Sequence, residues 1–179
     1  MRLIHYQRPF ILAIFAFIAI QGSAFAFQAD IKTACFSPDG NCTDAIIKEI
    51  DSATAEILIQ AYSFTSAPIA KALLNAHKRG VKVEAILDKS QRTANYSSAT
   101  FLANSRIPTY IDAKHAIAHN KVMIIDKATV ITGSFNFTKA AEEKNAENLL
   151  VIRSKELAGI YAENWYKHKE HSERYPPRY

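Results

Sequence analysis

A hairpin of two short apolar strands is the feature that most constrains the fold of this 179-residue chain. Residues 118–125 and 129–132 are rich in valine, isoleucine and methionine, and residues 126–129 suit a tight turn between them. Side chains of a strand alternate between two faces, so a shift of one residue would exchange the side chains of the two faces. The hairpin therefore predicts a β-sheet with a strictly set register.

Polar side chains stand at the open end of this hairpin. If the turn pairs its first residue with its last, Lys121 falls opposite Ser134 and His119 falls opposite Asn136. Directly opposed side chains lie about 5 Å apart on one face. The alternative is an ordinary polar strand end in solvent. We expect the four polar groups to converge at one end of two otherwise apolar strands.

The spacing His-x-Lys-x4-Asp occurs once in the chain, at His119, Lys121 and Asp126. Because strand side chains alternate, His119 and Lys121 share a face and Asp126 points the other way. Asp126 is therefore expected to be structural, bonded to turn amides or paired with a base elsewhere.

These residue types suit phosphodiester cleavage without a metal. The imidazole of His119 can attack phosphorus, and Lys121, Ser134 and Asn136 can hold the phosphoryl oxygens. Glu147 begins a later strand, and its carboxylate could accept a hydrogen bond from Nδ1 of His119, which leaves Nε2 free to attack. The alternative for Glu147 is an exposed glutamate at a strand end.

The rest of the chain alternates strand-like and helix-like segments. Residues 56–64, 66–79 and 81–87 have the order strand, helix, strand, which predicts a parallel pair with a right-handed crossover. Further strands are expected at 108–111 and 147–152, and further helices after Thr43, around 100–104 and at 154–168. We predict an α/β fold in which a mixed β-sheet is sandwiched by helices.

Residues 1–26 have the pattern of a secretory signal peptide. Arg2 and Arg8 precede an uncharged apolar run at 10–20, and the small residues Ala24 and Ala26 follow it. Cleavage after Ala26 would leave a single domain at 27–179 that is periplasmic or secreted and has no stable membrane association. The alternative is a retained membrane anchor.

Cys35 and Cys42 are the two cysteines of the chain. An exported protein meets an oxidising compartment, so we expect them to form a disulfide. Two free thiols are the alternative.

We expect no metal ion and no cofactor in the reaction, because the sequence shows no H-E-x-x-H, no Asp-x-Asp and no closely spaced histidine pair with carboxylates. His115 precedes His119 by roughly 13 Å of extended strand, too far for one zinc ion. It is expected to be a surface or phosphate-steering histidine. His77 and His168 are expected in packing or solvent, and His171 near a frayed end.

The run from His119 to Leu150, HNKVMIIDKATVITGSFNFTKAAEEKNAENLL, resembles the phospholipase D superfamily, whose motif is H-x-K-x4-D. It looks like the small bacterial branch that includes an EDTA-resistant endonuclease, and also like mitochondrial relatives described as nucleases or lipid hydrolases. The resemblance implies a metal-independent phosphodiesterase. It assigns His119 as nucleophile or acid, Lys121, Ser134 and Asn136 as phosphate ligands, Glu147 as support for the histidine, and Asp126 as a structural residue.

The single motif leaves half of this chemistry missing from one chain, because one imidazole cannot be neutral nucleophile and cationic acid in the same step. A two-fold homodimer would supply the second imidazole at a shared site. The leading hypothesis is thus a non-specific endonuclease that cleaves DNA, with RNA as a further substrate, through a phosphohistidine.

Two other functions stay open. One is a phospholipase D-type lipid phosphodiesterase, for which Phe135 and Phe137 would offer an apolar approach, although core packing or base stacking explains them equally well. The other is a non-catalytic nucleic-acid-binding protein.

Overall fold

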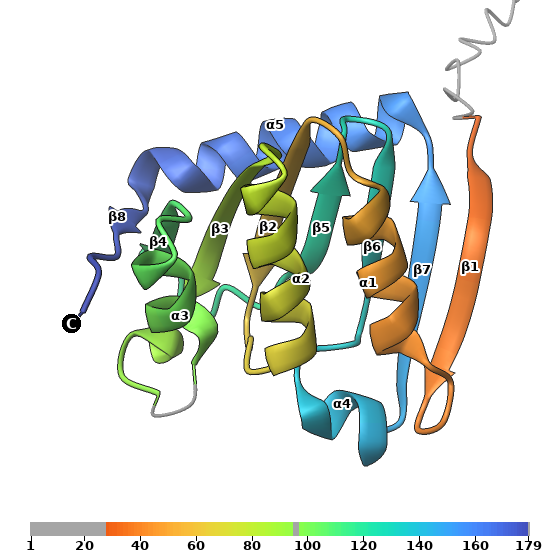
Figure 1. Ribbon diagram of the computed structural model, residues 1–179, viewed down its shortest axis with the longest axis horizontal. Coiled ribbons are helices and arrows are strands. Elements are labelled where there is room, and N and C mark those ends of the chain that lie inside the picture. Colours follow the sequence, from red (N-terminus) through yellow and green to blue (C-terminus); the bar gives the residue numbers. More distant parts are fainter. Residues whose placement is uncertain (1–27, 95–96, 179) are drawn as a thin grey trace, which may run out of the picture.

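A computed structural model describes residues 28–94 and 97–178, and the predicted signal peptide at 1–26 lies outside these ranges. One eight-stranded sheet has the strand order β1-β7-β6-β5-β2-β3-β4-β8 (Figure 1). The elements are β1 (Asp30–Ser37), α1 (Cys42–Ser52), β2 (Glu56–Ala61), α2 (Ala67–Lys78), β3 (Lys82–Asp88), the 3-10 turn η1 (Lys89–Arg92), α3 (Ser98–Asn104), β4 (Thr109–Asp112), β5 (Lys121–Ile125), β6 (Thr129–Gly133), α4 (Lys139–Glu143), β7 (Glu147–Arg153), α5 (Lys155–His171) and β8 (Glu173–Arg174).

Helices cover both faces of the sheet, which confirms the predicted α/β sandwich. Helices α1, α2 and α3 lie on one face and α5 crosses the other (Figure 1). Strand alternation builds both cores: Ile57 and Ile59 of β2 join the larger cluster under α1 and α2, whereas Leu58 joins the cluster with Trp165 of α5. In the described ranges, no helix is long and apolar enough to cross a bilayer.

The predicted strand–helix–strand unit is confirmed. β2 and β3 pair in parallel, from Glu56 opposite Lys82 to Ala61 opposite Leu87, and α2 connects them. Helix α2 begins after Ser66 and carries proline within its first two positions, where the missing N–H is not needed.

The predicted start of α1 is wrong by two residues, because Asn41 and not Thr43 precedes the first turn. The helix begins at Cys42, after Asn41 in a left-handed conformation, so Thr43 lies inside it. The N–H of Thr43 donates instead to the carboxylate of Glu142 in α4, at 2.6 Å. A disulfide joins Cys42 to Cys35 of β1, as predicted, and so ties the start of this helix to the edge of the sheet.

The predicted register of the β5–β6 hairpin is wrong by one residue. Thr129 pairs with Ile125 rather than with Asp126, and the ladder continues to Val122 opposite Thr132. Lys121 is therefore not opposite Ser134. The predicted pairing of His119 with Asn136 is absent as well, because β5 begins only at residue 121. The reason lies in the turn, where the first two residues both have φ of 51° and so leave the ladder.

Asp126 leaves the ladder because its carboxylate binds the segment before β2. It accepts hydrogen bonds from the backbone N–H groups of Thr54, Ala55 and Glu56 and from the hydroxyl of Thr54, at 2.8–2.9 Å. Burial raises the pKa of this carboxyl, but these hydrogen bonds outweigh it and leave the pKa below its usual value. Asp126 thus lies at the far end of β5 from Lys121.

We predict that Asp126→Asn lowers the free energy of unfolding by about 2–4 kcal/mol at pH 7, because a neutral amide replaces a charged multiple acceptor. The folded-state pKa is depressed, so this contribution is complete above about pH 4 and is lost as the pH falls through the folded-state value. Urea unfolding at pH 7 and pH 3 measures it. The control is Asp51→Asn, at an exposed aspartate of α1. Equal losses in both variants, or a loss that is undiminished at pH 3, would contradict the assignment.

Candidate active site

The edge of the sheet that matters here is the one formed by strand ends, where the parallel strands β2 and β3 end and β5 begins (Figure 1). Lys121 pairs with Ala61 at the end of β2, and Gly133 at the end of β6 pairs with Leu149 near the start of β7. A single bridge between Phe64 and Phe137 joins the loops that follow β2 and β6. The structure therefore brings the motif segments to one edge, although not through the predicted pairing.

His119 is exposed just before β5, and its ring rests against an aromatic neighbour. The ring centroids of His119 and Tyr62 lie 4.7 Å apart. The N–H of Tyr62 also donates to the carbonyl of Asn120 at 2.8 Å, which fixes the backbone beside the histidine. No motif singles out Tyr62, which follows β2 directly. Its contact leaves the imidazole accessible from solvent while restricting its position.

Lys121 is the buried cation of the site, with 6% of its surface exposed. Its Nζ donates to the carbonyl of His119 at 2.8 Å and lies 5.2 Å from the centre of the Tyr62 ring. Burial lowers the pKa of Lys121, and the negative charge of Glu147 opposes that shift. A partly desolvated ammonium next to an accessible imidazole is a strong site for a phosphate oxyanion.

Ser134 is held in place by Asn148 of β7. Its hydroxyl accepts hydrogen bonds from the backbone N–H of Asn148 at 3.0 Å and from the side-chain amide at 3.3 Å. This close approach requires glycine at 133, since a Cβ there would lie 2.2 Å from the carbonyl oxygen of Asn148. The hydroxyl hydrogen of Ser134 is thereby left available to donate to another acceptor.

Asn136 carries a buried side-chain oxygen, Oδ1, that has no hydrogen-bond partner. A buried polar atom without a partner is costly and is a recurrent feature of ligand sites. Its neighbours Phe135 and Phe137 are each 1% exposed and belong to the larger core. Core packing therefore accounts for these two phenylalanines, and they offer no apolar approach for a lipid.

Glu147 does not make the expected hydrogen bond to His119. Its carboxylate accepts from the side-chain amide of Asn145 at 3.1 Å instead. Glu147 acts on the buried ammonium of Lys121 through its charge. In this geometry it helps Lys121 to remain protonated.

The structure also gathers side chains that the sequence interpretation kept apart. His115, His168 and His171 surround the buried carboxylate of Asp112, and the donor atoms of all four lie within 4.8 Å of one another. His115 is exposed and His171 ends α5, as expected, but the expectation did not foresee that the three rings form one group around Asp112. Two spacings could have signalled the cluster, since Asp112 and His115, and likewise His168 and His171, are three residues apart.

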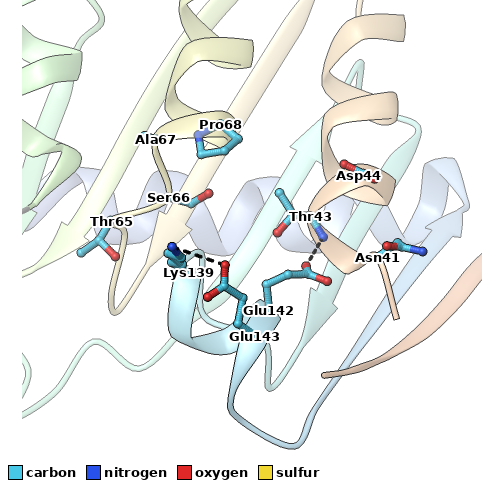
Figure 2. Close-up of a pocket in the computed structure, with 10 residues that line it drawn as sticks. All are labelled: Asn41, Thr43, Asp44, Thr65, Ser66, Ala67, Pro68, Lys139, Glu142 and Glu143. Carbon is cyan, nitrogen blue, oxygen red and sulfur yellow. Dashed lines mark hydrogen bonds and ion pairs between the residues drawn. The ribbon is translucent and has the colours of Figure 1, made fainter. Parts of the chain in front are cut away.

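A separate pocket of 540 Å³ lies between the first turns of α1 and α2 and helix α4 (Figure 2). Three of its charged groups are already engaged, since Glu142 accepts from Thr43 and Lys139 lies 3.5 Å from Glu143. The lining includes none of the six motif residues, so we place the candidate chemistry at His119 and not in this pocket.

The comparisons with known proteins agree with the motif. The family described as "Cardiolipin synthase, PLD-like domain" matches residues 46–168. The chain is also similar to a Rickettsia conorii protein named phospholipase D, with 47% identity over 137 residues, which are 76% of this chain and 68% of the relative. The human mitochondrial cardiolipin hydrolase is 28% identical over 73% of this chain and 52% of its own length. The chain therefore belongs to the phospholipase D superfamily, which confirms the resemblance.

Two solved structures extend this likeness to the whole fold. Nuc from Salmonella typhimurium, a phospholipase D family member, has a TM-score of 0.80 at 41% identity, over 83% of this chain and 99% of that structure. NucT from Helicobacter pylori has a TM-score of 0.74 at 27% identity, over 84% of this chain and 100% of that structure. Family and fold together identify the chain as a phosphodiesterase of this superfamily.

The two possible roles of Glu147 predict different pH profiles. In Glu147→Gln the charge that opposes burial is gone, so the pKa of Lys121 falls further and the alkaline limb of kcat/KM moves to lower pH. The profile is measured on a soluble phosphodiester, with Glu143→Gln as the control at an exposed glutamate nearby. Movement of the acidic limb in place of the alkaline limb would show that Glu147 acts on the histidine, as the sequence suggests.

Proposed function

We propose that this protein is a metal-independent, non-specific endonuclease that cleaves DNA, with RNA as a further substrate, at an active site shared by two chains. The observation that carries the proposal is that the exposed His119 and the buried Lys121 lie together at one edge of the sheet, where the ammonium of Lys121 donates to the backbone carbonyl of His119. The ammonium supplies at this edge the positive charge that a divalent cation would otherwise supply to a phosphate.

The reaction proceeds by two displacements at phosphorus. Neutral His119 attacks through Nε2, and the bond from phosphorus to the leaving oxygen breaks while a second, protonated imidazole gives that oxygen its proton. The same imidazole then takes a proton from water, which attacks phosphorus and releases His119. Lys121, Ser134 and Asn136 hold the phosphoryl oxygens in both steps.

The second imidazole comes from His119 of the other chain. The remaining described histidines lie elsewhere, with His77 on α2 and three others around Asp112. A two-fold axis beside the exposed His119 ring would bring two copies of the same residue to one phosphate. Ile117, which is 57% exposed only two residues away, gives this surface an apolar side chain suited to such a contact.

Several features favour a nucleic acid as the substrate. The site is an accessible edge rather than a deep apolar cavity, and the phenylalanines beside Asn136 are core residues. Lys114, Lys139 and Lys144 are exposed on the loops and helix near this edge and could follow a phosphate backbone. The full sequence has a formal net charge of +5, and cleavage after Ala26 would leave +3 because Arg2 and Arg8 are removed.

A lipid phosphodiester is the second candidate, and one observation favours it. An apolar groove of 530 Å³ runs between α2 and α3 from Thr65 to Phe101, with Leu74 along its wall. The Rickettsia relatives are named phospholipase D, and the mitochondrial relatives are named cardiolipin hydrolase. The groove would receive an acyl chain in that case. Membership of a phosphodiesterase family disfavours the third hypothesis, of a non-catalytic nucleic-acid-binding protein.

Parallel assays in EDTA separate these candidates. We expect the mature protein to degrade single- and double-stranded DNA and RNA with chelator present and to release no product from phosphatidylcholine or cardiolipin vesicles. His119→Ala should lower turnover by at least a thousandfold, since the nucleophile is lost, whereas His77→Ala should leave it unchanged. Hydrolysis of lipid alone would reverse the substrate assignment, and loss of all turnover in EDTA would refute a metal-independent reaction.

Mixing differently tagged chains tests the shared site. If both copies of His119 are needed, an equal mixture of wild-type and His119→Ala chains, after subunit exchange, retains about one quarter of the wild-type activity rather than one half. A purified heterodimer should then be inactive. Half-maximal activity in the heterodimer, or full activity in a monomer demonstrated by light scattering, would contradict the proposal.

The proposed location is periplasmic or secreted. Residues 1–26 would direct export, and the disulfide between Cys35 and Cys42 is typical of a protein that leaves the cytoplasm. The mass of the exported protein would decide the cleavage point, since the proposal requires Phe27 at its N-terminus.

A further inference from the structure

Four side chains away from His119 form a compact group with the composition of a zinc site. Asp112 contributes a fully buried carboxylate at the end of β4. His115 follows in the next loop, and His168 and His171 lie in the last turn of α5. Because His168 and His171 are three residues apart on a helix, their rings project from the same face. The four candidate ligands therefore come from three segments of the chain.

The distances within the group suit tetrahedral coordination. From Oδ2 of Asp112, Nδ1 of His168 lies at 2.7 Å, Nδ1 of His115 at 3.1 Å and Nε2 of His171 at 3.4 Å. A zinc ion bound to nitrogen at about 2.0–2.1 Å holds its ligand atoms about 3.3 Å apart. The distances from the carboxylate bracket this value, and because all four donor atoms lie within 4.8 Å of one another, the ring nitrogens must draw closer together to surround one ion.

Hydrogen bonding to Asp112 explains part of this group but not all of it. The carboxylate accepts from the N–H of Lys114 and lies within hydrogen-bond distance of one ring nitrogen of His115 and one of His168. The third ring is less well placed: Nε2 of His171 lies 3.4 Å from Oδ2 of Asp112, is buried and makes no hydrogen bond of suitable geometry. Its ring centroid nevertheless lies 5.2 Å from that of His115 and 5.4 Å from that of His168.

Without a metal ion, three imidazoles around a single carboxylate are an energetically unfavourable arrangement. If all three were protonated, one negative charge would face three positive charges. If they are neutral, the lone nitrogen of His171 stays unsatisfied at a cost. A divalent cation removes both difficulties, because neutral imidazoles and one carboxylate are its natural ligands.

We propose that Asp112, His115, His168 and His171 bind one zinc ion and that the ion is structural. Four protein ligands close a tetrahedral site and leave no position open for a substrate or a reactive water. β4 is also separated from β5 by two intervening strands, β3 and β2, which places the group about 14 Å along the sheet from the start of β5. The ion therefore takes no part in the displacement at His119.

Zinc at this position would clamp two parts of the chain together. One is the loop from residue 113 to 120, which runs from the cluster to His119. It is already held by the carboxylate of Asp88, which accepts from the N–H of Ala118 at 2.7 Å. The other is the end of α5, from which β8 continues to pair with β4. Bound zinc would thus stabilise the edge of the sheet and the loop that presents the nucleophile.

The test uses the untagged mature chain, stripped with chelator and then exchanged into chelator-free buffer. We expect titration calorimetry and elemental analysis to give one zinc per chain, and zinc to raise Tm by several degrees. Cobalt should give the visible absorption of a tetrahedral ion. His171→Ala should bind zinc at least tenfold more weakly, whereas His77→Ala should bind it like the wild type. The circular dichroism of both variants without metal confirms that they are folded.

Two results would overturn the zinc site: a wild-type affinity no greater than that of His171→Ala, or binding that His77→Ala abolishes while His171→Ala retains it. Its structural role is overturned if the stripped protein is folded yet inactive and zinc restores turnover. Persisting turnover in EDTA, together with a zinc-dependent Tm, supports the role.

Discussion

The carboxylate of Asp126 sets the register of the strand that carries the chemistry. By binding the amides before β2 it takes the turn out of the ladder and fixes where β5 begins to pair. β5 then places Lys121 beside Ala61, at the end of the sheet where β2 and β3 also finish. Slippage by one residue would send the ammonium to the face of α5. One polar contact, at the turn end of the hairpin, therefore controls the geometry at the other end of the strands.

Lys121 shows what the sheet contributes to the reaction. A lysine in solvent is well hydrated and would gain little from a phosphate, whereas burial weakens its hydration and makes an anionic partner more valuable. Glu147 compensates part of that burial and Tyr62 lies near the ammonium, while the accessible imidazole of His119 remains beside it. The arrangement is already in place before a substrate arrives, which is the condition for electrostatic catalysis.

The order of the inner elements could be predicted because their patterns are local. The apolar runs of β2 and β3 and the proline and glycine around α2 are visible within short windows of sequence.

The edge strand β1 escaped prediction because only Cys35 and Ser37 of its eight residues are buried, so it lacks a clear alternation. The hairpin register failed because it depends on hydrogen bonds between Asp126 and residues some 70 positions away. The motif residues, in contrast, were recognisable from spacing alone. The group around Asp112 was missed because 56 positions separate Asp112 from His168.

The edge at His119 and the group around Asp112 have different proposed roles, the first catalytic and the second structural. The proposed reaction uses an imidazole and an ammonium at the first without a metal ion, and the proposed zinc ion at the second ties together the loop and helix end beside it. The central claim is that His119 attacks phosphorus directly. The stereochemical course at phosphorus tests this most directly, using a phosphorothioate diester of known configuration cleaved in oxygen-18 water with EDTA present. Two successive displacements predict net retention of configuration, and inversion would show that water attacks phosphorus in a single step, contrary to this account.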